Sequence, residues 1–286
     1  MKQKIDTKAI GLDVGLAFIR WLTGAENLHY GLWTGLEVSA GNLRAAQDAY
    51  TNKLFDLLPE GPLKILDVGG GAGETAGKLT ALGHDVDIVV PSAFLAGRCR
   101  ENAPKARVHE MMYEDFRGEE GSFDLVLFSE SFQYIPLADS LGRSTRLLKP
   151  GGHLILADCF RAEGYQVGHL HQPGGGHAVE KFRVALKDSV FEVLSEEDIT
   201  AAVAPSIDLE QALFHVFGLA ITRIDTELTG KRPKSRWLLN RAYRLILNQR
   251  RRDKLHQRLM EHTRTAEAFQ QYNRYLMMKL RKPGEG

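Results

Sequence analysis

The stretch LDVGGGAGE, residues 66–74, places four glycines within nine positions, directly behind an apolar run and an aspartate. Residues 63–68 have the composition of a short buried strand, and residues 73–83 are expected to form a helix. A strand, a glycine turn and a helix N-terminus together bind nucleotide-like ligands, because unpaired backbone N–H groups and the helix dipole point at the ligand. The stretch therefore predicts a nucleotide-type site within an α/β fold.

The chain continues this alternation on the C-terminal side of the stretch. Helices are expected at 91–102 and 137–148, and further strands at 85–90, 106–110, 123–129, 149–160, 190–200 and 275–283. Strands that alternate with helices of about a dozen residues indicate βαβ units. We therefore expect an α/β fold with a Rossmann-like, doubly wound, mostly parallel sheet of seven strands.

Helical segments flank this core on both sides. A pair is expected at 8–22 and 42–58, and three long helices precede the last strand, at 208–223, 236–249 and 253–272. The chain is therefore expected to comprise an N-terminal helical lid (1–60), a cofactor-binding core (61–200), a helical substrate cap inserted before the last strand (201–272), and that strand with its tail (273–286).

The overall composition is that of a soluble globular protein, with 43% apolar and 26% charged residues among 286. The first residues lack the apolar region of a signal peptide, and no apolar run reaches the roughly 18 residues of a spanning helix. The two cysteines, Cys99 and Cys159, are too few for a disulfide scaffold. These features predict a cytoplasmic location.

The charge is distributed unevenly along the chain. From Lys231 onward there are 16 Lys and Arg against 4 Asp and Glu, a net of +12, whereas the preceding part has 21 against 32, a net of −11. Within 231–258, helical spacing separates an apolar side around Leu238 and Leu245 from a side around Arg241 and Arg251. This segment is either a solvated cationic surface or a contact for an anionic substrate, a carrier protein or a membrane rim. Nucleic acid fits poorly because the body is acidic, and the oligomeric state stays open.

The spacing of the glycines distinguishes three classes of cofactor. The dinucleotide fingerprint G-x-G-x-x-G would need its third glycine where Glu74 or Ala76 stands, which disfavours a nicotinamide dehydrogenase. A phosphate-binding P-loop would need Lys and then Ser or Thr directly after Gly73, which is followed by Glu74. The pattern that fits is acid-x-G-x-G-x-G, formed by Asp67, Gly69, Gly71 and Gly73.

This pattern resembles the first motif of class I S-adenosylmethionine-dependent methyltransferases, and the chain is similar to the small-molecule type of that family over about residues 26–160. SFDLVLFSESFQYIP (122–136) and LLKPGGHLILAD (147–158) resemble its fourth strand with the following loop and its fifth strand. The resemblance implies S-adenosylmethionine as cofactor and S-adenosylhomocysteine as product. It also implies that Asp67 meets the cofactor's ammonium group. The other implied cofactor contacts are Gly69, Gly70, Gly71, Gly73, Asp115, Phe116, Ser129, Gln133 and Tyr134.

One position departs from the family pattern. The second strand of the family usually ends on an acidic residue that binds the ribose hydroxyls, and here Val90 stands at that place. A lost charge-assisted hydrogen bond weakens binding by about tenfold to a hundredfold, since it contributes about 1.5–3 kcal/mol. Ser92 is a candidate for a weaker ribose contact, whereas Asp87 is expected to be buried or to face away from the cofactor.

Methyl transfer from a sulfonium is an in-line displacement that needs a positioned nucleophile, excluded water and in some cases a base. Three side chains are candidates for the catalytic roles: Glu130 after the fourth strand, His177 in the loop after the fifth strand, and Tyr30 in an aromatic segment that can fold over the cofactor. Each has an ordinary structural alternative, namely a capping carboxylate, a loop histidine and a packed aromatic cluster. Substrate contacts are expected from Trp33, Phe132 and His171. No metal is expected, because His169 and His171 lack a matched third ligand.

The resemblance implies a methyltransferase that acts on oxygen, nitrogen or carbon of a small or medium-sized metabolite. A natural product, an isoprenoid or a carrier-bound chain that is anionic or partly apolar would fit the inserted helices and their charge. A cofactor-binding accessory or regulatory protein without transferase activity is the alternative. The sequence does not identify the substrate or the methylated atom.

Overall fold

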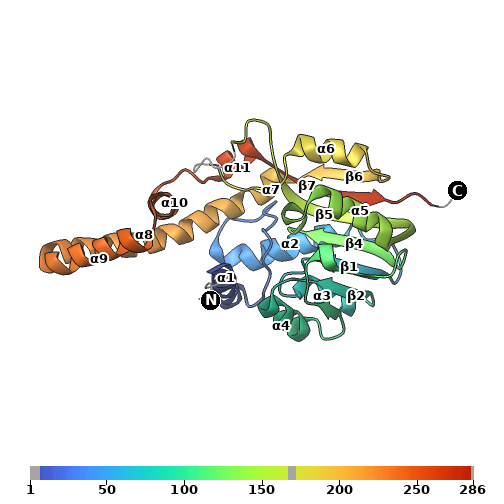
Figure 1. Cartoon of the computed structure of the whole chain (residues 1–286), viewed down its shortest axis with the longest axis horizontal. Helices are drawn as coiled ribbons and strands as arrows, with labels where there is room; N and C mark the ends of the chain where they lie inside the picture. Colours follow the sequence, from blue (N-terminus) through green and yellow to red (C-terminus); the bar gives the residue numbers. More distant parts are fainter. Residues whose placement is uncertain (1–6, 167–171, 285–286) are drawn as a thin grey trace.

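The computed structural model describes residues 7–166 and 172–284. Its centre is one seven-stranded sheet in the order β3-β2-β1-β4-β5-β7-β6, which confirms the predicted fold class (Figure 1). β7 runs antiparallel to both of its neighbours, β5 and β6, and the other pairs are parallel. The strands are β1 Lys64–Val68, β2 Asp85–Val89, β3 Arg107–His109, β4 Phe123–Ser129, β5 Leu148–Arg161, β6 Glu192–Asp198 and β7 Asn273–Arg281.

Helices cover both faces of the sheet, so its central strands are buried on two sides and read as nearly continuous apolar runs. One core layer packs side chains such as Tyr50, Leu79 and Cys99 under α1 (Thr7–Thr23), α2 (Leu43–Phe55), α3 (Glu74–Ala81), α4 (Ala93–Asn102), α7 (Thr200–Val203) and α11 (Ala266–Tyr272). The opposite layer packs Leu141 and Phe182 from α5 (Leu137–Leu147) and α6 (Val179–Lys187). Asp67 is the polar exception among the buried residues of β1, and it lies at the candidate site.

The helices before the last strand differ from their predicted limits. α8 (Pro205–Lys231) continues beyond residue 223, and α9 spans Pro233–Ile246. The expected helix 253–272 is two helices, α10 (Gln249–Met260) and α11. Local capping explains the breaks: the Asn248 side chain accepts from the Arg251 N–H at 3.0 Å, and Thr265 accepts from the Ala268 N–H at 3.2 Å.

The distal part of α8 and the whole of α9 project away from the body (Figure 1). Within Pro233–Ile246 no residue is buried. Among the described helices, none is both long and apolar enough to cross a membrane.

Candidate functional site

The glycine turn links β1 to the N-terminus of α3 at the carboxyl edge of the sheet. Gly71 has φ +56° and Gly73 has φ +89°, in the left-handed region that favours glycine. A Cβ on Gly73 would lie 2.8 Å from the Cα of Cys99, so α4 packs directly against the turn. A Cβ on Gly71 would be in ordinary contact with Leu28 at 3.8 Å, and both residues line a ligand-sized cavity. The turn thus presents bare backbone and a helix N-terminus to this cavity.

Asp67 supplies the charge at the base of this cavity, whose volume is about 510 Å³. The side chain is 1% exposed, and its Oδ2 has no hydrogen-bond partner among the described residues. Burial raises the pKa of Asp67 to about 7, because desolvation disfavours the carboxylate. A buried and unpaired carboxylate oxygen facing a cavity is the binding partner that a ligand ammonium group needs.

A second cavity of about 720 Å³ adjoins the first. Its walls are mostly apolar and come from α1, α2 and α8, with Phe18, Leu43 and Leu213 as examples. The two cavities share five lining residues, which are Asn27, Leu28, His29, Glu130 and Tyr134. A ligand on the glycine turn therefore borders directly on a larger apolar space.

Glu130 lies at the junction of the two cavities, in the loop after β4. It has φ +58°, an arrangement that costs a non-glycine residue about 1–3 kcal/mol and often marks a functional position. Its Oε1 accepts hydrogen bonds from the Tyr30 N–H at 2.8 Å and from the Tyr275 hydroxyl at 2.9 Å. Burial raises the pKa of Glu130 to about 7, although both hydrogen bonds lower it. The carboxyl can therefore exchange a proton near neutral pH.

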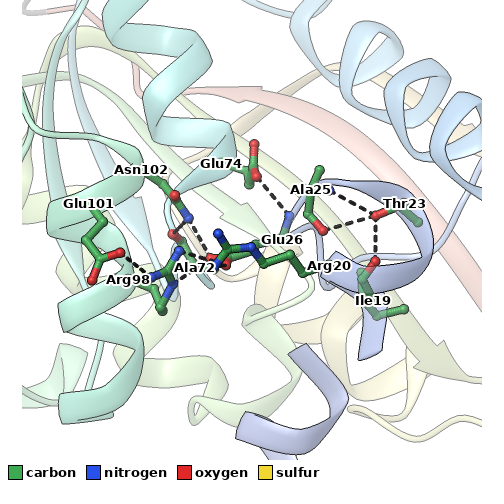
Figure 2. Close-up of polar contacts among 10 residues, drawn as sticks. All are labelled: Ile19, Arg20, Thr23, Ala25, Glu26, Ala72, Glu74, Arg98, Glu101 and Asn102. Atoms are coloured by element: carbon green, nitrogen blue, oxygen red, sulfur yellow. Dashed lines mark hydrogen bonds and ion pairs between the residues drawn. The ribbon is translucent and has the colours of Figure 1, made fainter. Parts of the chain in front are cut away.

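The segment after α1 closes over the first cavity and is fixed there by Glu26 (Figure 2). Its carboxylate forms a two-pronged ion pair with Arg98 of α4, at 2.7 and 2.8 Å, and accepts from the Asn102 amide at 2.7 Å. The Glu26 N–H donates to Glu74 at 2.8 Å, at the start of α3. These contacts hold the pKa of Glu26 below its usual value, against the effect of desolvation. This lid clamp fastens the N-terminal segment to the core.

Glu26→Gln is expected to lower the affinity for S-adenosylhomocysteine by roughly tenfold, because loss of a buried ion pair leaves Arg98 with only the exposed Glu101 as counter-charge and loosens the lid. Titration calorimetry measures the affinity. Glu227→Gln is the matched control, since Glu227 pairs with Lys231 on an exposed helix surface where the loss of such a pair has little effect. Equal affinities for the two variants would show that the clamp does not support ligand binding.

Many of the predicted residues do line the two cavities. Tyr30 lines the larger cavity, where its ring packs edge-on against Phe269. Val90 is 2% exposed and borders the smaller cavity, so an apolar side chain stands there instead of an acid. The other predicted residues that line one or both cavities are Gly69, Gly70, Gly71, Ser129, Gln133 and Tyr134.

Four predicted cofactor contacts lie outside the described linings of both cavities, and one of them, Gly73, packs against Cys99 of α4. Ser92 caps α4 by accepting from the Leu95 N–H at 3.3 Å, and Pro91 and Leu95 line the cavity in its place. Asp115 and Phe116 line a separate depression beside Asp87, beyond the edge of the cofactor cavity. The ribose contact of Ser92 and the adenine contact of Asp115 therefore stay predictions. The ion pair of Asp87 with Arg107 agrees with the expectation that Asp87 faces away from the cofactor.

Three other candidates pack inside the fold. Phe132 is fully buried under the sheet, and Trp33 packs beside Leu43 with its Nε1 donating to Ser206 at 2.8 Å. His177 places Nε2 at 2.9 and 3.2 Å from the carbonyls of Ile135 and Phe132, which makes this nitrogen a donor, and the residue is outside the described linings of both cavities. These contacts disfavour His177 as a base and Phe132 and Trp33 as substrate contacts. His171 lies outside the described residues.

Sequence reasoning missed three parts of the site. The lid clamp joins Glu26 to a helix that lies 72 positions later in the chain. Tyr275 reaches Glu130 from β7, and its hydroxyl also bonds to that of Tyr50 at 2.8 Å. His29 stacks on Tyr50 and lines both cavities, and burial lowers its pKa to about 4, so its ring is neutral. The aromatic spacing HYGLW (29–33) was a signal for this region, but it did not single out His29.

In the part of the chain that the structure describes, no group of three or more His, Cys, Asp or Glu is placed to hold a metal ion. Asp158 of β5 is fully buried and accepts from the N–H groups of Gln133 and Cys159. Its role in the described structure is to support the loop after β4.

Comparison with known proteins agrees with this geometry. Residues 66–156 match the family model described as a methyltransferase domain. The chain is 32% identical over 188 residues to a biotin biosynthesis bifunctional protein of Bordetella avium. That match covers 63% of this chain and 38% of the bifunctional protein, so the chain spans well under half of this relative.

Solved structures share the fold at low sequence identity. A geranyl diphosphate C-methyltransferase from Streptomyces coelicolor A3(2), in complex with Mg²⁺, geranyl-S-thiolodiphosphate and S-adenosyl-L-homocysteine, gives a TM-score of 0.63 at 16% identity, with 93% of this chain and 91% of the other covered. A cyclopropane synthase from Mycobacterium tuberculosis gives 0.66 at 16% identity, with 99% and 100% covered.

Proposed function

We propose that this chain, which carries a class I S-adenosylmethionine-dependent methyltransferase domain, transfers a methyl group to a small or medium-sized amphipathic molecule. The observation that carries the proposal is the pair of adjoining cavities with Glu130 at their junction. One cavity is bounded by the glycine turn and Asp67, and the other is larger and mostly apolar.

The residues of the smaller cavity fit the cofactor. The unpaired Oδ2 of Asp67 can accept a hydrogen bond from the ammonium group of the cofactor. The aliphatic side chains of Leu28, Val90 and Leu95 border the remaining space. When bound, S-adenosylmethionine supplies a methyl group on a sulfonium, which needs no metal and no redox partner.

The chain's own contribution to the reaction is positioning, exclusion of water and removal of a proton. The lid segment with Leu28 and His29 covers the junction of the two cavities. Glu130, with its raised pKa, accepts the proton that an oxygen, nitrogen or carbon nucleophile loses on methylation. Tyr30 N–H and Tyr275 position this carboxylate through their hydrogen bonds.

The lining of the larger cavity supports a substrate with an apolar body and an anionic group. Arg258 and Arg264 both lie beside Glu210, so two guanidinium groups share one carboxylate. Both arginines line the larger cavity, where their guanidinium groups can meet an anionic group of the substrate. The geranyl-S-thiolodiphosphate held by the Streptomyces coelicolor enzyme has the same combination of an apolar chain and an anionic group. Isoprenoid, natural-product and carrier-bound acyl substrates are therefore the classes to examine.

Titration calorimetry tests cofactor binding. We expect S-adenosylmethionine and S-adenosylhomocysteine to bind and NAD not to bind. Gly71→Ala is expected to weaken binding by at least about tenfold, because the added methyl enters the cavity at a left-handed backbone position. Gly83→Ala is the matched control: Gly83 has φ +93°, and a Cβ there meets no described atom within 4 Å. Equal losses of affinity would mean that backbone strain, and not the cavity, causes the effect.

Transfer itself is tested with methyl-labelled cofactor and a panel of amphipathic anions and their neutral analogues. We expect label in the anionic members. If the cofactor binds but none of the panel is methylated, the result supports the accessory-protein alternative. If the cofactor does not bind at all, both the methyltransferase proposal and the accessory-protein alternative are wrong.

A further inference from the structure

The projecting helices carry an apolar surface that the described fold leaves uncovered. We define the arm as residues 219–254, which comprise the distal half of α8, α9 and the start of α10 (Figure 1). Leu245 and Ile246 are 78% and 76% exposed, and Trp237, Leu238 and Leu239 are 58–63% exposed. Monomeric soluble proteins rarely leave such large apolar side chains together in water. The arm therefore has the surface of a docking element.

The charge of the arm indicates its partner. It contains eleven Lys and Arg against three Asp and Glu, a net of +8, and Arg250, Arg251 and Arg252 are consecutive. Positions 238, 242, 245 and 246 share one side of α9, whereas Arg244 lies on the opposite side and Arg241 flanks the apolar set. Trp237 lies on the basic side, where the Arg241 guanidinium is 5.6 Å from its ring. A helix with Leu and Ile on one side and Arg on the other is typical of segments that lie in a membrane interface.

Two other kinds of partner would contact either the basic or the apolar side chains of the arm, but not both. Phosphates of a nucleic acid would use the cationic side chains but would leave Leu245 and Ile246 in water. A second arm would cover the apolar side, but it would bring two segments of net +8 together. An anionic lipid bilayer provides hydrocarbon and negative charge at the same surface.

We propose that the arm docks on an anionic membrane surface, with the apolar side of α9 inserted between headgroups and the basic side chains in contact with them. The same helix connects this surface to the larger cavity. Leu209, Leu213 and Val216 of α8 line the cavity, and the arm begins three residues later. Docking therefore places the cavity beside the lipid, where amphipathic molecules concentrate. This last step rests on the proposed function, whereas docking itself does not.

The experiment is vesicle co-sedimentation of the full chain without cofactor or substrate. One set of vesicles contains phosphatidylcholine alone, and the other contains equal parts of phosphatidylcholine and phosphatidylglycerol. We expect binding to the second set to be at least about tenfold tighter and to weaken as salt is raised. Because no methyl transfer is measured, failure of the proposed function would leave this result unaffected.

The matched variants place new charges on exposed helices. Leu245→Glu combined with Ile246→Glu is expected to reduce vesicle binding by at least about tenfold. Val184→Glu is the control, because Val184 is 61% exposed on α6, away from the arm (Figure 1). Thermal unfolding checks that both variants fold, and sedimentation equilibrium is run on all three proteins. No binding by the unaltered chain, equal binding to neutral vesicles, or equal losses in the two variants would overturn the proposal. A dimer that does not bind vesicles and dissociates in the double variant would assign the apolar side to a second copy.

Discussion

Glu130→Gln is expected to lower kcat by about 10²–10⁴-fold, the usual contribution of a positioned general base. Glutamine keeps the shape of the side chain and an oxygen that can accept from the Tyr30 N–H and the Tyr275 hydroxyl. The fold and the affinity for S-adenosylhomocysteine should therefore change little. Steady-state kinetics with the best substrate of the panel measures kcat, and calorimetry measures the affinity. Undiminished kcat would remove Glu130 from the reaction.

The pH profile separates a base from a merely structural carboxyl. With the pKa of Glu130 raised to about 7, kcat/KM should rise with pH through that value as the carboxyl ionises. Tyr275→Phe removes a hydrogen bond that stabilises the ionised form, so the rise should move to higher pH. Tyr113→Phe is the control, since its hydroxyl is equally buried but bonds to Ser144 in the opposite core layer. A profile that does not move in Tyr275→Phe would contradict this assignment of the base.

The fold could be predicted because the patterns that indicate it lie within short stretches of the sequence. LDVGGGAGE contains the strand end, the turn and the helix start within nine residues, and the structure places them as expected. The apolar runs that predict β4 and β5 are buried on both faces of the sheet, so their residue types follow directly from their environment. The limits of α8, α10 and α11 were predicted less well. They depend on the caps at Asn248 and Thr265, whose residue types are also common in loops.

Most residues of the candidate site that were predicted lie at or near the ends of strands. Asp67 and Glu130 lie directly at strand ends, and strand ends of a parallel sheet meet at one edge. The partners of Glu130 come from elsewhere: Tyr275 lies 145 residues away in an antiparallel strand. His177 has the chemistry of a base, but its contact with two carbonyls depends on how the loop after β5 folds back. No periodicity or motif encodes such contacts.

Asp67→Asn is expected to weaken S-adenosylhomocysteine binding by about tenfold to a hundredfold, because a charge-assisted hydrogen bond to the ammonium group is lost. The pH dependence is more diagnostic. In the free chain the pKa of Asp67 is raised to about 7, so the carboxyl is neutral below this pH. Affinity for the cofactor should therefore increase as pH rises through about 7 in the unaltered protein and stay flat in the variant.

The same substitution should stabilise the free protein. Because the pKa of Asp67 is higher in the folded chain than its model value of 3.8, the unfolded chain releases this proton first. The free energy of unfolding of the unaltered chain then falls by up to about 4 kcal/mol between about pH 4 and 7. Above about pH 7 this group causes no further change. Asn has no such titration, so the melting temperature of the variant should exceed that of the unaltered chain by a margin that grows over this range.

Saturating S-adenosylhomocysteine should shrink or reverse the margin, because the ligand's ammonium group stabilises the carboxylate only when Asp67 is present. A variant that is less stable than the unaltered chain at pH 8 without ligand would show that Asp67 is a structural residue, paired within the fold, and not a buried charge kept for a ligand.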